Sequence, residues 1–128
     1  MKTKLTKLEI EELLSDERAE LKSIDLFYLK KAKKIDAGFL DSCTSLTELD
    51  LSALKSIRRI EKNFLYSCCS LPSLDLSPLK NVRKIGDYFL ASCHNLKKIT
   101  FDDQTWEGEP YTIAQQAKDY ILQHNKGI

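Results

Sequence analysis

The chain has 128 residues, of which 42% are hydrophobic and 30% charged, and its formal net charge is +1. This length and balance indicate one compact domain, and they exclude the strong basic or acidic bias that would point to a class of partner. No apolar run reaches the roughly 18 residues of a membrane span, and Glu9, Glu11 and Glu12 interrupt any apolar region of a signal peptide, so we expect a cytoplasmic protein with no membrane contact.

Residues 1–20 are expected to form an N-terminal helical cap. Thr6 followed by Glu9 is the pattern of a capping box, in which each side chain satisfies a backbone N–H group at the start of a helix. Leu8, Leu13 and Leu14 then share one helical face. Such a cap would cover the open end of the segment that follows.

Residues 21–101 repeat one pattern at a period of 25 residues, in three full copies (21–45, 46–70 and 71–95) and a fourth that stops after Phe101. Fixed periods of this size mark stacked architectures, in which neighbouring units bury one another's apolar faces. Each copy opens with LxxLxL, and two inward positions with one outward between them indicate a short strand. We therefore expect one strand per coil, laid side by side in a parallel sheet over a shared core.

The third copy continues as VxxIGxxFLxxCxxL from Val82 to Leu96, with the Ile-Gly pair at Ile85 and Gly86. This order resembles the BspA-like class of leucine-rich repeats across residues 21–101. With its flanking segments, the chain is then expected to be an α/β leucine-rich-repeat solenoid with a parallel sheet, three full coils, a partial fourth and a helical cap at each end. The resemblance also implies a binding scaffold, and an adhesin-like surface role follows from the family alone.

Residues 102–128 are expected to be a loop and a second helical cap. Thr112 with Gln115 has the spacing of a capping box. An apolar stripe follows on one helical face, and Gly127 is a candidate residue for the end of the helix. The stripe consists of Ile113, Ala117, Tyr120 and Ile121, and the preceding loop contains Trp106, Gly108, Pro110 and Tyr111.

Three of the four cysteines, Cys43, Cys68 and Cys93, occupy the same apolar position in consecutive coils. Stacking at strand spacing separates them by about 5 Å, wider than the Cβ separation of about 3.8 Å in a relaxed disulfide. We expect buried, reduced thiols, and we expect Cys69 to be the reactive one.

An acidic face is expected on the outer side of the predicted sheet, where carboxylates recur in register. The carboxylates could dock a basic partner, or each could accept hydrogen bonds from nearby backbone and hydroxyl groups such as Ser52 and Ser77 and so be structural. The face consists of Asp25, Glu48, Asp50, Asp75 and Lys98.

A basic face is expected from nine cations that fall in three columns. They could follow a line of phosphates or an acidic protein surface, or they could simply be solvated, since Asp36, Glu61 and Asp87 lie beside them. Six of them define the basic face, namely Lys33, Lys34, Arg58, Arg59, Arg83 and Lys84, and the third column is Lys30, Lys55 and Lys80.

Large aromatic residues form a third candidate surface, the aromatic edge. Phe27 and Tyr28 replace small residues of later coils, and Trp106 lies near the other end of the repeats. Each could be covered by a cap or could anchor a partner.

Catalysis has little support, because the sequence has two histidines and no phosphate loop, nucleophile elbow or metal-ligand pair. Cys69 and His94 share one repeat position and could be neighbours, but no orienting group accompanies them. We therefore predict no enzyme activity and assign no catalytic, cofactor or metal residues. We expect a noncatalytic protein-binding module, a small intracellular adaptor or stoichiometric inhibitor that acts through a charged face. Nucleic-acid binding along the basic face is the alternative, and the sequence leaves the partner and the oligomeric state open.

Overall fold

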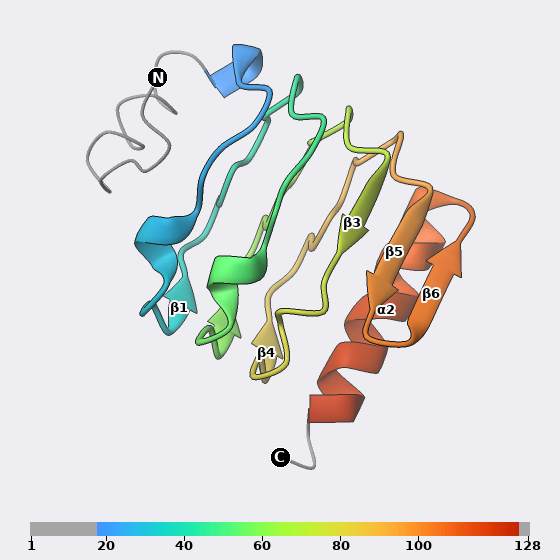
Figure 1. Ribbon diagram of the computed structural model, residues 1–128. Helices are drawn as coiled ribbons and strands as arrows, with labels where there is room; N and C mark the ends of the chain where they lie inside the picture. Colours follow the sequence, from blue (N-terminus) through green and yellow to red (C-terminus); the bar gives the residue numbers. More distant parts are fainter. Residues whose placement is uncertain (1–17, 126–128) are drawn as a thin grey trace.

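The computed structural model describes residues 18–125, which wind through coils stacked side by side (Figure 1). The stacking keeps the period of the sequence, because Lys34 pairs in parallel with Arg59, and Ser73 with Lys98, each 25 residues further along the chain. This is the stacked, parallel arrangement that the repeat predicts.

One sheet contains β3 (Ser73–Asp75), β5 (Lys98–Phe101) and β6 (Gln104–Glu107). Strands β3 and β5 are parallel, whereas β6 folds back antiparallel to β5. The strand predicted at LxxLxL is thus confirmed in the third and fourth coils. The corresponding residues of the first two coils are not in strands.

Pro72 accounts for part of this difference. The N–H of Thr47 donates to the carbonyl of Lys22 (3.2 Å), and the N–H of Lys97 donates to the carbonyl of Pro72 (3.0 Å). Pro72 itself has no N–H, so the third coil cannot make the same bond to the second. The ladder along the predicted sheet is therefore interrupted between coils two and three.

A second parallel sheet, which the sequence analysis did not predict, lies farther along each coil. Its order is β1-β2-β4, and its strands run opposite to β3 and β5 (Figure 1). Ile35 and Ile60 point inward from it and belong to the same buried core as Leu74 and Ile99. The outer sides of the two sheets therefore face away from each other. Its strands are β1 (Lys34–Ile35), β2 (Arg59–Ile60) and β4 (Lys84–Ile85).

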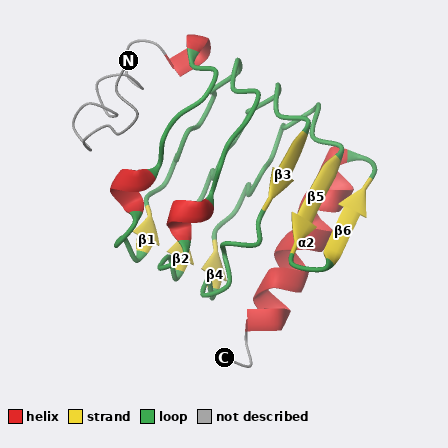
Figure 2. Ribbon diagram, viewed as in Figure 1, coloured by secondary structure: helices red, strands yellow, loops and turns green. Residues whose placement is uncertain are grey.

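Short turns and loops connect these strands and make up most of every coil (Figure 2). The first two coils turn through single 3₁₀ helices, and the third turns at Ser77 and Pro78 without one. These helices are η2 (Phe27–Leu29) and η3 (Ser52–Leu54), and η1 (Arg18–Glu20) precedes the first coil.

The return segment of every coil alternates its backbone conformation, with three residues at positive φ. Leucine in this region is strained, because its Cβ crowds the following carbonyl. Bonds between coils hold the conformation in place: the N–H of Gly38 donates to Lys62 (2.9 Å), and that of Leu65 donates to Phe39 (2.9 Å). The positions are Gly38, Leu40 and Ser42, then Asn63, Leu65 and Ser67, then Tyr88, Leu90 and Ser92.

A stack of phenylalanines packs inside this segment. The ring of Phe64 is fully buried and lies parallel to those of Phe39 (5.5 Å between centroids, 10° between planes) and Phe89 (5.4 Å, 11°). Consecutive coils thus contribute one ring each to a continuous column.

The three stacked cysteines are buried as predicted, and all four cysteines are free thiols. The thiol of Cys68 donates to the carbonyl of Leu40, and that of Cys93 to the carbonyl of Leu65, both at 3.1 Å. Burial raises the pKa of Cys93 to about 11, and contact with the thiol of Cys43, followed by burial, raises the pKa of Cys68. The thiols therefore act as neutral donors to carbonyls of the preceding coil.

The C-terminal end is covered by helix α2 (Pro110–Asn125), as predicted. The predicted capping box is wrong, however, because the carboxylate of Glu109 accepts the N–H groups of Tyr111 (3.2 Å) and Thr112 (3.1 Å). Pro110 at the first helical position, with its preset φ, favours a start at this point. The predicted apolar stripe is confirmed, with Ile113, Ala117 and Ile121 buried and Tyr120 half-buried.

The last described turn of α2 is fastened to the third coil by Asn125. Its buried amide nitrogen donates to the carbonyls of Leu79 (3.0 Å) and Val82 (2.8 Å). At the other end of the chain, the predicted helical cap at residues 1–20 lies almost entirely outside the described residues.

Candidate functional site

The acidic face lies on the outer side of the LxxLxL segments, and its three aspartates make the same contact in every coil. Oδ1 of Asp25 accepts the N–H of Phe27, Oδ1 of Asp50 that of Ser52, and Oδ1 of Asp75 that of Ser77, each at 2.9 Å. This bond, from a carboxylate to the backbone two residues later, fixes the turn that follows the strand. The three aspartates therefore have the structural role expected as one of two alternatives, that of accepting hydrogen bonds from nearby backbone.

At Asp50 the same contact also lowers the pKa of the carboxyl group. The backbone N–H of Ser52, and after it the hydroxyl of that residue, hold the pKa of Asp50 below its usual range. Asp50 and Asp75 remain exposed to solvent. The row is therefore both a set of turn caps and a set of oriented carboxylates, one in each of the first three coils, about 4.8 Å apart at strand spacing.

Strand β6 extends this face by one strand. The sequence did not predict this strand, because Trp106 was expected in a loop. Lys98 lies opposite Glu107 in the antiparallel pair, and Thr100 lies opposite Thr105. Thr105 and Glu107 are both exposed. The Asp-Asp pair at 102–103 could have indicated this strand, because two such residues between strand-forming segments are typical of a hairpin turn. In the structure Asp102 has a φ of 52°, as such a turn requires.

The structure brings the six residues of the basic face together in the second sheet and just before it. Lys34, Arg59 and Lys84 are in direct register, and the N–H of Arg83 donates to the carbonyl of Arg58 at 2.8 Å. All six side chains are exposed, as are the three lysines of the third column.

Acidic neighbours reduce the charge of this surface unevenly. Nζ of Lys34 lies 3.5 Å from Asp36, and Nη1 of Arg59 lies 3.8 Å from Glu61. In the third coil the equivalent position is Gly86, whose backbone packs against the second coil so closely that a Cβ would lie 2.6 Å from the nitrogen of Lys62. Gly86 therefore supplies no carboxylate at this position, and in the third coil Nζ of Lys80 lies 3.4 Å from Asp102 instead.

The aromatic edge is divided between the two ends of the repeats. Phe27 is 42% exposed and lies under the ammonium of Lys30, 5.2 Å from the ring centroid. Tyr28 is half-buried against the core. Trp106 packs edge-on against Tyr120 of α2 (5.4 Å) and so belongs to the C-terminal cap.

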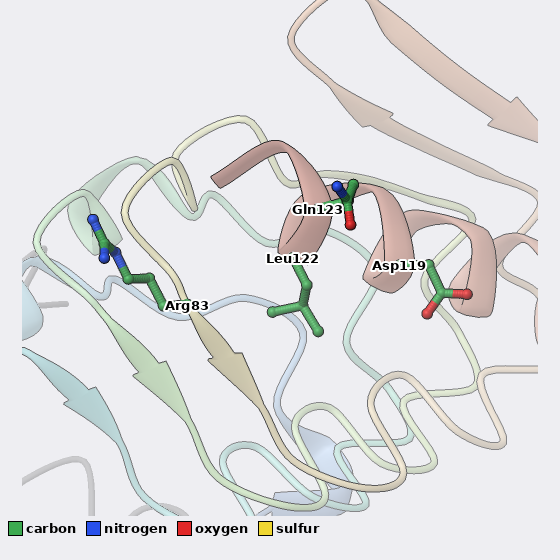
Figure 3. Close-up of a pocket in the computed structure, with 4 residues that line it drawn as sticks. All are labelled: Arg83, Asp119, Leu122 and Gln123. Atoms are coloured by element: carbon green, nitrogen blue, oxygen red, sulfur yellow. The ribbon is translucent and has the colours of Figure 1, made fainter. Parts of the chain in front are cut away.

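Two other places in the described part of the chain hold side chains that could support chemistry. Cys69 is half-buried and His94 exposed, and none of the hydrogen bonds among residues 18–125 joins them. A groove of about 580 Å³ lies between the third coil and α2, lined by Arg83 on the coil and by Asp119, Leu122 and Gln123 on the helix (Figure 3). Within the described part of the chain, no three potential ligand residues cluster as a metal site would require.

Comparison with protein-family models gives a match over most of the chain. The family model described as "BspA type Leucine rich repeat region (6 copies)" matches residues 3–117. No curated protein matches the chain, and no solved structure does. Among residues 18–125, no helix combines the length and the apolar character needed to cross a membrane.

The matched range agrees with the hydrogen bonds at the start of the repeats. The hydroxyl of Ser70 donates to the carbonyl of Thr44, and that of Ser45 donates to the carbonyl of Ala19, both at 2.5 Å. Ala19 thus occupies the place of Thr44 one coil earlier, so the register already holds before residue 21. With repeats of this sequence pattern stacked in this register, the chain belongs to the BspA-type leucine-rich-repeat family.

Proposed function

We propose that the protein is a noncatalytic protein-binding module that acts through its acidic face, as a small adaptor or stoichiometric inhibitor. Leucine-rich-repeat domains generally mediate protein interactions and are generally noncatalytic, which supports the class of function. The cytoplasmic location expected from the sequence remains part of this proposal.

The repeated aspartate contact carries the proposal. Because each carboxylate is fixed by a 2.9 Å bond to the backbone, little rotational freedom remains to be lost when a partner binds. Each carboxylate still has a second oxygen that can accept a charge-assisted hydrogen bond. A rigid row of such acceptors suits a protein surface that presents lysine or arginine side chains.

The residues two positions before the aspartates, at 23, 48 and 73, and their counterpart at 98 also favour a basic protein partner. Glu48 lies in the second coil and Glu107 at the far edge, while Ser23 and Ser73 leave the adjoining positions small. Lys98 is the cation of this column, at the fourth coil. Negative charge over the first three coils therefore comes from Glu48 and the three aspartates and can guide a basic partner, whereas Glu107 lies opposite Lys98 at the far edge.

Asparagine replacements test the proposal without removing the turn caps. Asparagine also accepts a backbone N–H through its side-chain oxygen, so D25N/D50N/D75N removes three charges and keeps the turns. In affinity recovery from the native host, wild-type protein should retain one partner in stoichiometric amount, and the asparagine variant should lose it. The matched control R58E/R59E/R83E/K84E should retain it. Equal recovery by the wild-type and asparagine proteins would refute the role of the acidic face.

Nucleic-acid binding along the basic face is the second candidate, and the register of Lys34, Arg59 and Lys84 favours it. Clustered cations supply most of the nonspecific affinity for phosphate backbones. Against it, the ion pairs with Asp36 and Glu61 neutralise part of the row. A gel shift that falls steeply with salt and disappears in R58E/R59E/R83E/K84E would support this function, and no shift at low salt would exclude it.

A further inference from the structure

We propose that the acidic face of one copy docks on the basic face of a second copy, so that the protein assembles head to tail. This inference rests on the proposed function, because it names the basic partner of the acidic face as the chain itself. It follows from the sign, the spacing and the opposite placement of the two faces.

The spacing of the two rows is the same because the same coils carry both. Asp25 and Lys34 belong to the first coil, Asp50 and Arg59 to the second, and the parallel pairing holds every coil in register with the next. Cations and carboxylates therefore recur at one common interval of about 4.8 Å. When the two faces meet, several carboxylates can lie opposite cations at once.

The charge balance favours attraction. The basic face and its third column carry nine cations, and four acids lie beside them: Asp36, Glu61, Asp87 and Asp102, the last 3.4 Å from Nζ of Lys80. The acidic face has the opposite sign over the first three coils, where Asp25, Asp50 and Asp75 lie. The formal net charge of +1 shows that these charges nearly cancel in the whole chain, so like copies repel weakly at long range.

The geometry also determines the type of assembly. Both sheets send their inner residues into one core, as Ile60 and Leu74 show, so the two charged faces point in opposite directions. A pair of copies joined by one acidic and one basic face leaves one face of each kind open. Such contacts are heterologous, and they continue into open stacks rather than closing as a two-fold dimer.

Sedimentation velocity measures this directly. At about 20 mM salt the weight-average mass should rise with protein concentration, and at about 0.5 M salt, where exposed charges are screened, it should return to the monomer mass of 14.7 kDa. The variant D25N/D50N/D75N should associate less at the same concentration. A mass of 14.7 kDa at every concentration and salt would overturn the proposal.

Charge reversal in two separate variants gives a sharper test. One variant reverses the acidic face while asparagine keeps the turn caps. The other makes the basic face and its third column, together with the acids beside them, net negative without changing Lys34, Arg59 or Lys80, which form ion pairs. Each should remain monomeric alone, because its two faces then have the same sign, and an equimolar mixture should associate. The variants are S23K/D25N/E48K/D50N/S73K/D75N and K33E/K55E/R58E/K84E.

Circular dichroism of each variant confirms that it is folded before the mixture is made. A mixture of folded variants that stays monomeric would overturn the proposal. The proposed function has a separate readout: a wild-type protein that is monomeric throughout, yet loses a foreign protein partner through D25N/D50N/D75N, refutes self-association alone.

Discussion

Replacing Phe64 with alanine should remove the centre of the aromatic column. Its ring is fully buried and stacked between Phe39 and Phe89 at 5.5 and 5.4 Å. Truncating a buried phenylalanine costs about 3 to 5 kcal/mol, and each aromatic pair contributes about 0.5 to 1.5 kcal/mol of stacking. We expect a loss of about 4 kcal/mol, because neighbours on both sides are held by their own coils and cannot close the cavity. For a chain of this size, this corresponds to a fall in Tm of about 15 °C.

Two matched variants separate burial from stacking in that measurement. Phe64→Leu keeps most of the apolar volume and should cost about 1.5 kcal/mol. Phe39→Ala removes a half-buried ring and should cost about 2 kcal/mol, less than its neighbour. Urea unfolding followed by circular dichroism gives the free energies, and the fluorescence of the single Trp106 reports the C-terminal cap separately. A loss below about 1 kcal/mol for Phe64→Ala would refute the stacked register.

Four other predictions follow from individual contacts. Gly86→Ala should destabilise the fold by about 2 kcal/mol or more in urea unfolding, because its Cβ would meet the backbone of the second coil at 2.6 Å, whereas Gly38→Asn, at a site where the second coil already has asparagine, should be neutral. Asn125→Asp should lower the free energy of unfolding by about 3 kcal/mol, since a carboxylate would face the two buried carbonyls that the amide now binds; a loss no greater than for an exposed helix residue would contradict that fastening. The lowered pKa of Asp50 means that its contribution to stability is present at neutral pH and disappears as the pH falls through the folded pKa, so the wild type should lose stability below about pH 4 more steeply than Asp50→Asn does. A mild thiol reagent should modify only Cys69 in the native protein and all four cysteines after denaturation, and a native protein with no reactive thiol would contradict this.

Much of the fold could be predicted because the repeat determines it. The 25-residue period gave the parallel register, and the inward positions of LxxLxL gave core residues such as Leu74 and Ile99. The second sheet could not be found from periodicity, since strands of two residues show no alternation. The start of α2 was misplaced because Thr112 has capping-box spacing, whereas the side chain of Glu109 makes the cap in the folded chain.

The candidate site was predicted in position but not in detail. The columns of charge follow directly from the repeat, so Asp50 and Arg59 lie on the outer sides that the sequence indicated. The contact between each aspartate and the backbone two residues later was one of two alternatives, because a sequence does not show where a side chain points. Glu107 extends the acidic face because the chain forms a hairpin at 102–103. The sequence analysis did not predict this hairpin, so it did not place Glu107 on the face.

Titration calorimetry measures whether the acidic face binds a protein through preorganised charge. The measurement compares the affinity of wild-type protein and D25N/D50N/D75N for the recovered partner at about 50 mM salt, with the Tm of both proteins recorded. Because exposed charge pairs contribute roughly 0.5 kcal/mol each, losing three should weaken binding about tenfold while the Tm stays unchanged. Equal affinities for the two proteins, at equal Tm, would show that the three carboxylates do not contribute to binding.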